Sequence, residues 1–283
     1  MVSDQQNCGN LLAGVGQFAI ERGLLAASSP KTTVKVHLVN SGQLATVTLE
    51  TPDSVPRYSG DTTIAGVPGT AAAVLQNFPE AAGATCGSLL PSGEPVNRIA
   101  GVDATLIDNG MPVVIVPASD FSDCDVSGYE SREQLEANDA LRQKLEKIRL
   151  LAGPMMQLGD VTDKTVPKMT LVAAPRDSGG GSITTRTFIP HRCHASIGVL
   201  GAVSVATAVV IPGSVAHRVA DHAKISNSDK GASDGSRQIV VEHPLGELSI
   251  VVDADASDEK IDVRSASVVR TARKLFEGKV FGR

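Results

Sequence analysis

The chain has 283 residues, of which 42% are hydrophobic and 20% are charged, so it is long enough for one large or two ordinary globular domains and too apolar for a disordered chain. Its formal net charge is −5, and no basic stretch stands out along the sequence, which argues against nucleic-acid binding. The four cysteines show no CxxC spacing, which is typical of free thiols in a reducing cytoplasm rather than of a disulfide framework or a zinc site.

The N-terminal sequence and the most apolar segment both argue against a secreted or membrane protein. Residues 1–10 lack the basic and then apolar layout of a signal peptide. The run from Val199 to Pro212 is too short to span a bilayer and is rich in Ala, Ser and Thr. We therefore expect no membrane association.

The N-terminal third of the sequence predicts a buried helix followed by a β-hairpin. Asn7 is a suitable N-cap residue, and residues 8–27 are apolar nearly all round, which is the pattern of a helix covered on every face. Two β-rich runs, Val34–Val39 and Leu44–Leu49, flank the turn sequence Asn-Ser-Gly and predict the hairpin. Ala71–Phe78 is the most regular strand candidate that follows.

The rest of the chain predicts further strands, one exposed helix and a second buried helix. The exposed helix spans Ser131–Leu151, opens with a capping-box pattern of Ser131 and Gln134, and ends at Gly153-Pro154. A second helix that is apolar all round runs from about Cys193 to Val210. The remaining strand candidates are Ala104–Pro117 with a break at 108–110, Lys168–Ala174, Ser182–Ile189, Ile239–Val241 and Leu248–Val252, the last two forming a hairpin.

The two predicted buried helices indicate an internal duplication. When Cys8 is set against Cys193, each cysteine opens an apolar helix rich in small residues, and each helix is followed by a hairpin. The second helix has the strand-rich stretch 99–192 ahead of it, whereas the first has only residues 1–7. Because a wholly apolar helix needs cover on all sides, we expect either an N-terminally truncated form of a longer protein or a partner that covers the first helix.

This duplication predicts a division of the chain into three parts. Residues 1–98 form a first domain that is incomplete because its leading strands are absent. Residues 99–264 form the second domain, and residues 265–283 are a C-terminal segment that returns to the first.

The starts of the two apolar helices are the best candidates for chemistry. The unpaired N–H groups and the macrodipole of a helix N-terminus attract carboxylates, and a cysteine there has a lowered pKa that makes its thiol usable for proton transfer. The alternative for Cys8 and Cys193 is that each is a small buried residue, which is the usual place of a free cysteine. The context Asn-Cys-Gly-Asn favours a functional Cys8, whereas Cys193 stays open between the two interpretations.

Basic and imidazole side chains cluster ahead of the second helix. Arg186 offers a bidentate fork to a carboxylate, and His191 and His194 flank Cys193. The spacing of these two histidines and the cysteine matches no standard metal site, so we predict none.

Several motifs resemble the PrpF family. They are NCGNLLAGVGQFAIERGL, IDNGMPVVIVPASD, IRLLAGPMMQLGDV, VPKMTLVAAP, FIPHRCHASIGVLGAVSVATA and VRTARKLFEGKV, and they cover most of the chain. The resemblance implies a diaminopimelate-epimerase-like α+β fold, with two pseudo-repeated domains that each wrap a β-barrel-like sheet around a central helix. It is strongest to the branch that acts on 4-oxalomesaconate in the bacterial breakdown of aromatic acids.

The resemblance also implies the chemistry of the site. Family members move a proton across an allylic system of an unsaturated di- or tricarboxylate, with no metal and no organic cofactor. Their catalytic pair is a Lys and the Cys of the NCGN motif. The Cys matches Cys8, and the Lys comes from a segment before the motif that this sequence does not contain. Together with the helix starts, this makes Cys8 the expected catalytic residue, and the expected substrate-binding residues are Asn7, Gly9, Asn10, Met111, Arg186, His194, Ala195 and Ser196.

Three functions stay open on these grounds. The first is an isomerase or tautomerase acting on 4-oxalomesaconate or a related unsaturated tricarboxylate, and the second is the same chemistry on 2-methylaconitate. The third is an inactive remnant that binds carboxylates, because the segment with the catalytic Lys is missing. The expected partner is a small polycarboxylate, with no nucleic acid and no membrane, and a homodimer is the assembly we consider.

Overall fold

The strands and helices described here are those of a computed structural model, which describes residues 8–39, 42–79, 81–176, 180–227, 236–256, 261–279 and 281. The strands are, in chain order, β1 (Lys31–Leu38), β2 (Gln43–Glu50), β3 (Ala73–Pro79), β4 (Asn97–Ile99), β5 (Val102–Asp108), β6 (Pro112–Pro117), β7 (Lys168–Ala173), β8 (Ile183–Phe188), β9 (Ser226–Asn227), β10 (Ser236–His243), β11 (Gly246–Ala256) and β12 (Ile261–Thr271). The α-helices are α1 (Gly9–Glu21), α2 (Arg132–Ala137), α3 (Asp139–Met155), α4 (Val199–Val210) and α5 (Val215–Val219), and short 3-10 helices lie at Pro52–Ser54, Ala118–Cys124 and His222–Lys224.

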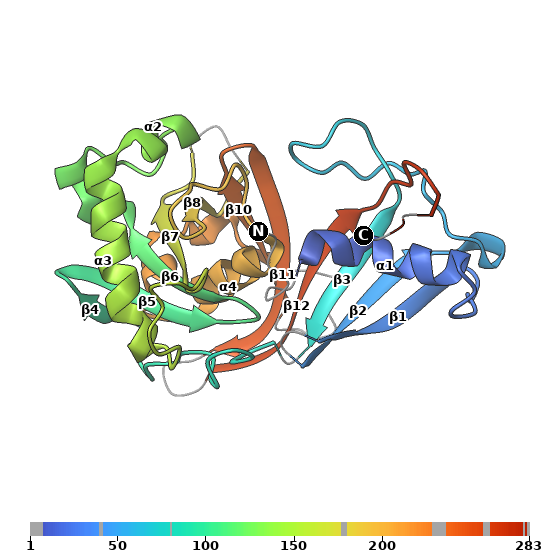
Figure 1. The fold of residues 1–283 in the computed structure, drawn as a ribbon, viewed down its shortest axis with the longest axis horizontal. Coiled ribbons are helices and arrows are strands. Elements are labelled where there is room, and N and C mark those ends of the chain that lie inside the picture. The colour runs from blue at the N-terminus through green and yellow to red at the C-terminus, as the bar shows by residue number, and fades with distance from the viewer. Residues whose placement is uncertain are drawn as a thin grey trace.

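These strands pair into one continuous mixed sheet. Its order is β1-β2-β3-β12-β11-β10-β8-β7-β6-β5-β4, with β9 paired to β10. The pairs β8–β10 and β6–β7 are parallel. Figure 1 shows that α1 lies in the lobe of β1–β3, that α2, α3 and α4 lie in the lobe of β4–β8, and that β11 and β12 run between the two lobes. No helix in the described part of the chain is long and apolar enough to cross a bilayer.

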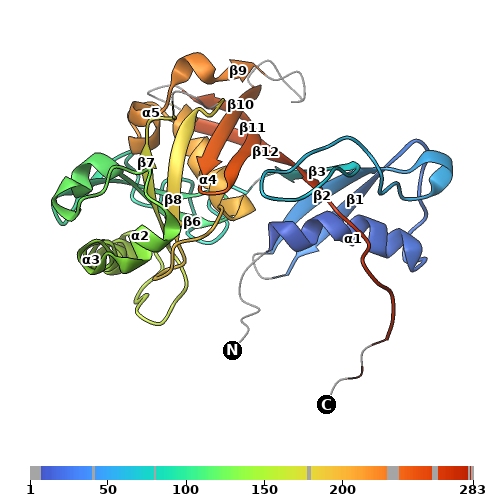
Figure 2. The same ribbon diagram turned by 90° about the horizontal axis from the view of Figure 1, so that it is seen from above.

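One face of α1 packs on β2, β3 and β12 (Figure 2). The buried side chains of this face include Leu12 and Ala13, whereas Leu11 is 76% exposed and Phe18 is 57% exposed. The strands of this chain therefore lie along one side of α1 only, and the apolar surface for which we expect additional cover is exposed on the other side. The N-cap residue is Cys8, not the predicted Asn7, which lies outside the described residues.

The second apolar helix, α4, is buried along its whole length, as its composition predicts. It packs among β5, β6, β10, β11 and α5. Its N-cap is Gly198, so the prediction that the helix opens at Cys193 is wrong. The reason lies in the backbone, because the N–H of His194 donates to the carbonyl of Thr187 on β8 (2.7 Å) and Cys193 forms a β-bridge to Phe188. The N-cap that corresponds to Cys8 is therefore Gly198, not Cys193, and the internal duplication stays a prediction.

The long exposed helix of the sequence is two helices in the structure. Ser131 caps α2 with the predicted capping box, in which Gln134 is the partner. The chain then breaks at Asn138, whose side chain caps α3 by accepting from the N–H of Leu141 (2.9 Å). The helix does not end at Gly153-Pro154 but includes Pro154 and reaches Met155.

The predicted hairpins are confirmed as the antiparallel pairs β1–β2 and β10–β11. The strand region 104–117 forms β5 and β6, which pair across its predicted break. The division at residues 98 and 264 stays a prediction, and β12 spans the second of these boundaries.

Candidate active site

A cavity of about 180 Å³ opens where the N-terminal ends of α1 and α4 meet. Both helices are longer than two turns, and their first N–H groups have no partner within the helix. The side chains and backbone that line the cavity come from α1, the β5–β6 turn, β7, β8 and the start of α4: Cys8, Gly9, Asn10, Met111, Lys168, Thr187, Ile189, His194, Gly198, Val199, Leu200 and Gly201.

The first turn of α1 is held against α4 by close packing. A Cβ atom at Gly9 would lie 2.6 Å from the Cβ of Val199, so the two helix starts can approach this closely only with a glycine at this position. On the other side of α1, Nε2 of Gln76 donates to the carbonyl of Gly9 (2.7 Å). These contacts fix the helix end on which Cys8 and Asn10 sit.

The lining favours an anionic ligand. The residues of this cavity within the described ranges include Lys168 and His194 but neither Asp nor Glu. Two helix N-termini add the positive ends of their macrodipoles and their free N–H groups, an arrangement that attracts carboxylate or phosphate. The cavity is therefore suited to a small molecule that carries more than one negative group.

Cys8 occupies the N-cap position of α1 and is exposed. Its carbonyl accepts from the N–H of Leu12 (3.1 Å), which begins the helix, while its thiol side chain borders the cavity. A thiol at a helix start can give a proton to, or take one from, a bound ligand.

Asn10 lies on the first turn of α1 and is held by a residue from the far end of the chain. Nη2 of Arg270, on β12, donates to Oδ1 of Asn10 (2.5 Å). Burial lowers the pKa of Arg270. A guanidinium has donors only, so this contact orients the amide oxygen of Asn10 toward β12 and its NH₂ group away from it.

Lys168 is a cavity residue that was not predicted from the sequence. It is the first residue of β7 and is buried, with its Nζ donating to the carbonyl of Thr165 (2.7 Å). Burial and, second, the cation of Arg149 lower the pKa of Lys168 to about 8. A lysine at the head of a strand whose other residues are apolar apart from Thr170, in the motif VPKMTLVAAP, is the signal that points to it.

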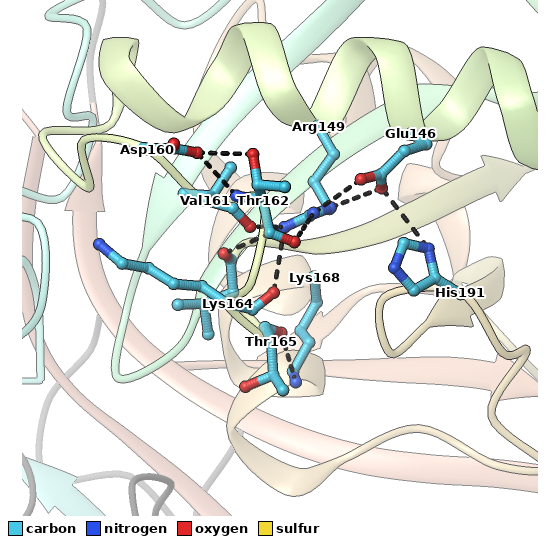
Figure 3. A network of polar contacts seen from close by, with 10 residues as sticks. Glu146, Arg149, Asp160, Val161, Thr162, Lys164, Thr165, Lys168 and His191 are labelled. Atoms are coloured by element: carbon cyan, nitrogen blue, oxygen red, sulfur yellow. Dashed lines mark hydrogen bonds and ion pairs between the residues drawn. The ribbon is translucent and has the colours of Figure 1, made fainter.

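The loop that leads to Lys168 is fixed by Arg149 of α3 (Figure 3). The Arg149 side chain is fully buried, and its Nη1 donates to the carbonyls of Val161 (2.8 Å) and Lys164 (3.2 Å). Its Nε and Nη2 donate to the carboxylate of Glu146 at 2.7 and 2.8 Å. Arg149 thus ties residues 161–166, and with them the approach to Lys168, to the helix layer.

His194 borders the cavity from the segment between β8 and α4. Its Nδ1 accepts from the N–H of Ser196 (2.9 Å). Burial and, second, the cation of Lys168 lower the pKa of His194. The ring is therefore favoured in its neutral form near neutral pH.

The structure brings part of the predicted set together. Cys8, Gly9, Asn10, Met111 and His194 border the one cavity. Asn7 lies outside the described residues.

Ala195 and Ser196 precede α4 instead of opening it, so their N–H groups are not the helix-terminal donors that were expected. Ser196 is instead a partner of two histidines, because its Oγ also lies 3.2 Å from Nε2 of His243.

Arg186 faces a different hollow, of about 160 Å³, next to Glu242 and His243. Its Nε donates to the carbonyl of Glu130 (2.7 Å), and its Nη1 to that of Thr185 (2.8 Å). It therefore does not line the cavity that holds Cys8.

Cys193 does not have the lowered pKa expected at a helix start. It is buried, and burial raises the pKa of its thiol to about 11. This agrees with the interpretation of Cys193 as a small buried residue. Across the described part of the chain, no three His, Cys, Asp or Glu side chains gather in a way that could hold a metal ion.

Comparison with known proteins places this site in a family. The family model described as PrpF protein matches residues 1–283. The chain belongs to the PrpF family. It is 52% identical over 282 residues to the (4E)-oxalomesaconate Delta-isomerase of Novosphingobium sp. (strain KA1), a match that covers 99% of this chain and 74% of that protein. It is also 52% identical over 276 residues to the 4-oxalomesaconate tautomerase of Pseudomonas putida, covering 97% of this chain and 71% of that one.

A solved structure confirms the fold of this PrpF protein. Methylitaconate-delta-isomerase superposes with a TM-score of 0.79 at 27% identity, covering 99% of this chain and 73% of that one. The diaminopimelate-epimerase-like fold and the isomerase class that the motifs imply are thus confirmed at the level of the family.

Proposed function

We propose that this PrpF protein isomerises 4-oxalomesaconate or a closely related unsaturated tricarboxylate. The observation that carries the proposal is the cavity at the meeting point of two helix N-termini, which places Cys8 among N–H donors and basic side chains. A substrate with several carboxylates can place one at each helix start and leave its carbon chain beside the thiol. The names of the relatives add the substrate class.

The reaction is a proton shift across three carbons. A base removes a proton from a carbon next to a carbonyl, and the electron pair of that C–H bond forms a new C=C bond. The electrons of the original C=C bond then form a C–H bond at the other end of the allylic system, with a proton from an acid. One proton is lost and one is gained, so nothing is oxidised or reduced, and Cys8 exchanges one of these two protons.

The two helix starts also suit the intermediate of this reaction. When the proton leaves, negative charge moves onto the carbonyl oxygen, and fixed N–H donors in a partly enclosed cavity stabilise that charge more than water does. The N–H groups of α1 and α4 and the Asn10 amide are donors of this kind. The same groups bind the unreacting carboxylates and orient the carbon chain.

The test is turnover by the 283-residue chain itself. Proton NMR in deuterium oxide follows 4-oxalomesaconate and, in a parallel sample, 2-methylaconitate, because each turnover exchanges carbon-bound hydrogen for deuterium. We expect isomerisation of 4-oxalomesaconate with the larger kcat/KM, and a loss of roughly a hundredfold or more in the Cys8→Ser variant. Cys124→Ser, at a buried cysteine outside the cavity, is the matched control.

Each other result overturns part of the proposal. A larger kcat/KM for 2-methylaconitate shows that this compound, not 4-oxalomesaconate, is the preferred substrate. Full activity of Cys8→Ser removes the thiol from the reaction. If calorimetry shows binding of both compounds and no turnover is found, the chain is a carboxylate-binding protein and not an enzyme.

We also propose a cytoplasmic homodimer as the working form. The free thiols of Cys8, Cys86, Cys124 and Cys193 support a reducing compartment. The exposed Leu11 and Phe18 on the open face of α1 support an apolar contact with a second copy. Sedimentation of the purified chain at two concentrations tests the dimer, and a single monomer boundary at both contradicts it.

A further inference from the structure

Two residues ahead of α4, His194 and Ser196, form a hydrogen bond that determines which nitrogen of His194 carries a proton. The N–H of Ser196 donates to Nδ1 of His194 (2.9 Å). A backbone N–H can only donate, so Nδ1 must accept and cannot itself be protonated. The single proton of the neutral imidazole therefore sits on Nε2.

The second nitrogen of His194 is accessible. Within the described residues, Nε2 has no hydrogen-bond partner, and it is not one of the fully buried polar atoms that lack one. His194 also borders the cavity that holds Cys8. The Nε2–H group is thus a fixed donor that is available to a bound molecule.

We propose that His194 is a catalytic residue that works as a neutral imidazole, donating a hydrogen bond from Nε2–H to the substrate oxygen on which charge develops. The proposal rests on the proposed function for the identity of the substrate. A neutral N–H donor stabilises the enolate-like oxygen without giving up its proton, so no bond of the imidazole forms or breaks. The proton shift itself is carried out by the acid and the base of the reaction, one of which is Cys8.

The charged groups around His194 keep the ring neutral. Lys168 on β7 and Arg132 on α2 face it with cationic side chains and lower the pKa of His194, in addition to burial. Burial first, and then the cation of Arg270 and a charge on His194, lower the pKa of His243 on β10, and Ser196 contacts both rings. The cation of Lys168 thus makes an imidazolium at His194 unfavourable.

A nitrogen NMR experiment on the unmodified chain tests the tautomer without any turnover. Long-range ¹H–¹⁵N correlation of the ring nitrogens distinguishes protonated from unprotonated positions. We expect unprotonated Nδ1 and protonated Nε2 for His194 near neutral pH. His217 is the internal contrast, because its Nδ1 faces the carbonyl of Val209 (2.9 Å) and must be the protonated nitrogen. An Nδ1–H tautomer or an imidazolium at His194 overturns the proposal.

Amide substitutions test the donor in the reaction. The Gln side chain places an NH₂ group close to the position of Nε2, whereas Asn places it close to Nδ1. We expect His194→Gln to keep kcat within about tenfold, and His194→Asn to lose roughly a hundredfold or more in kcat with little change in KM. His191→Gln, at an exposed histidine beside the same loop, is the control. Equal losses in the Gln and Asn variants contradict the proposal.

Removing the cation of Lys168 tests whether this charge lowers the pKa of His194. We expect Lys168→Met to raise the pKa of His194, as measured by NMR titration, whereas Lys147→Met on the exposed face of α3 leaves it unchanged. An unchanged His194 titration in Lys168→Met contradicts this role. If no turnover of 4-oxalomesaconate is found, its addition must still shift the Nε2 resonance, and the absence of a shift overturns the proposal independently of the proposed function.

Discussion

Arg270 and Asn10 are 260 residues apart in sequence, yet Nη2 of Arg270 donates to Oδ1 of Asn10 across 2.5 Å. The contact joins β12, which pairs with β3 on one side and β11 on the other, to the first turn of α1. Because it fixes the amide of Asn10 with its NH₂ group turned away from β12, it makes Asn10 a donor at the cavity wall. We therefore expect binding of a carboxylate to depend on a residue of the C-terminal motif.

The substitution Asn10→Asp tests this orientation. A carboxylate keeps the contact to Arg270 but replaces the donor at the cavity with negative charge, which repels an anionic substrate. We expect KM to rise by about ten- to hundredfold, since hydrogen bonds to charged groups contribute about 1.5–3 kcal/mol. The unfolding free energy stays the same or rises, because the new pair is an ion pair.

The control for this variant is Asn97→Asp. It adds the same charge on β4, outside the cavity, and leaves KM unchanged. An unchanged KM in Asn10→Asp as well shows that the substrate does not contact this amide.

The close approach of the two helix starts gives a second prediction. In Gly9→Ala the new Cβ would lie 2.6 Å from the Cβ of Val199, so the first turn of α1 has to move away from α4. We expect a stability loss of about 1–3 kcal/mol and weaker binding of 4-oxalomesaconate, measured by urea unfolding and calorimetry. Gly14→Ala in the same helix meets no atom within 4 Å, so we expect it to stabilise by about 0.5–1 kcal/mol and to leave binding intact. Equal behaviour of the two variants contradicts the close contact.

Local signals in the sequence were sufficient for the hairpins and for the capping box at Ser131. Each of these depends on residues within a few positions of one another, so chain-local chemistry decides it. The start of α4 was misplaced because the chain turns back after β8, so that Cys193 pairs with Phe188 instead of opening a helix, and apolar composition does not reveal this turn. Which face of α1 is covered could not be predicted, since an apolar sequence does not say which sides of a helix its neighbours occupy.

The candidate site was predictable where a motif and a helix end coincide. Cys8, Gly9 and Asn10 follow one another at the start of α1, so a correct helix start places all three at the cavity. Arg186 is close in sequence to the predicted start of the second helix, but it lies on β8 and lines a different hollow. Lys168 was missed because the fold, through the loop fixed by Arg149, brings a strand end from another part of the chain to the thiol.

Arg149 provides a third prediction, on stability. Its buried guanidinium is bonded to the carboxylate of Glu146 and to the carbonyls of Val161 and Lys164, so Arg149→Met leaves several buried acceptors without a donor. We expect a loss of roughly 3 kcal/mol in the free energy of unfolding by urea. The same variant raises the pKa of Lys168, because a neighbouring cation is removed.

The matched control is Arg142→Met on the same helix. Arg142 pairs with Asp139 at the exposed surface, and surface pairs contribute about 0–1 kcal/mol. A similar small effect in Arg149→Met contradicts the structural role of the buried cation.

His243 gives a fourth prediction, on the pH dependence of stability. Its ring is buried, and burial, followed by the cation of Arg270, lowers the pKa of His243 to about 4 from an ordinary value near 6.5. The folded state therefore binds this proton less readily than the unfolded state does. The contribution of His243 to stability is fully present above about pH 6.5 and is lost as the pH falls toward about 4, amounting to roughly 3 kcal/mol.

The measurement compares urea unfolding near pH 7.5 and near pH 4.5 for the wild type and two variants. His243→Gln keeps a donor toward Oγ of Ser196 but does not titrate, so its loss of stability on acidification should be smaller than that of the wild type by up to about 3 kcal/mol. His37→Gln, at an exposed position on β1, should follow the wild type. Because carboxylates also titrate in this range, the decisive quantity is the difference between His243→Gln and the wild type, and a difference of zero means that His243 is protonated equally in both states.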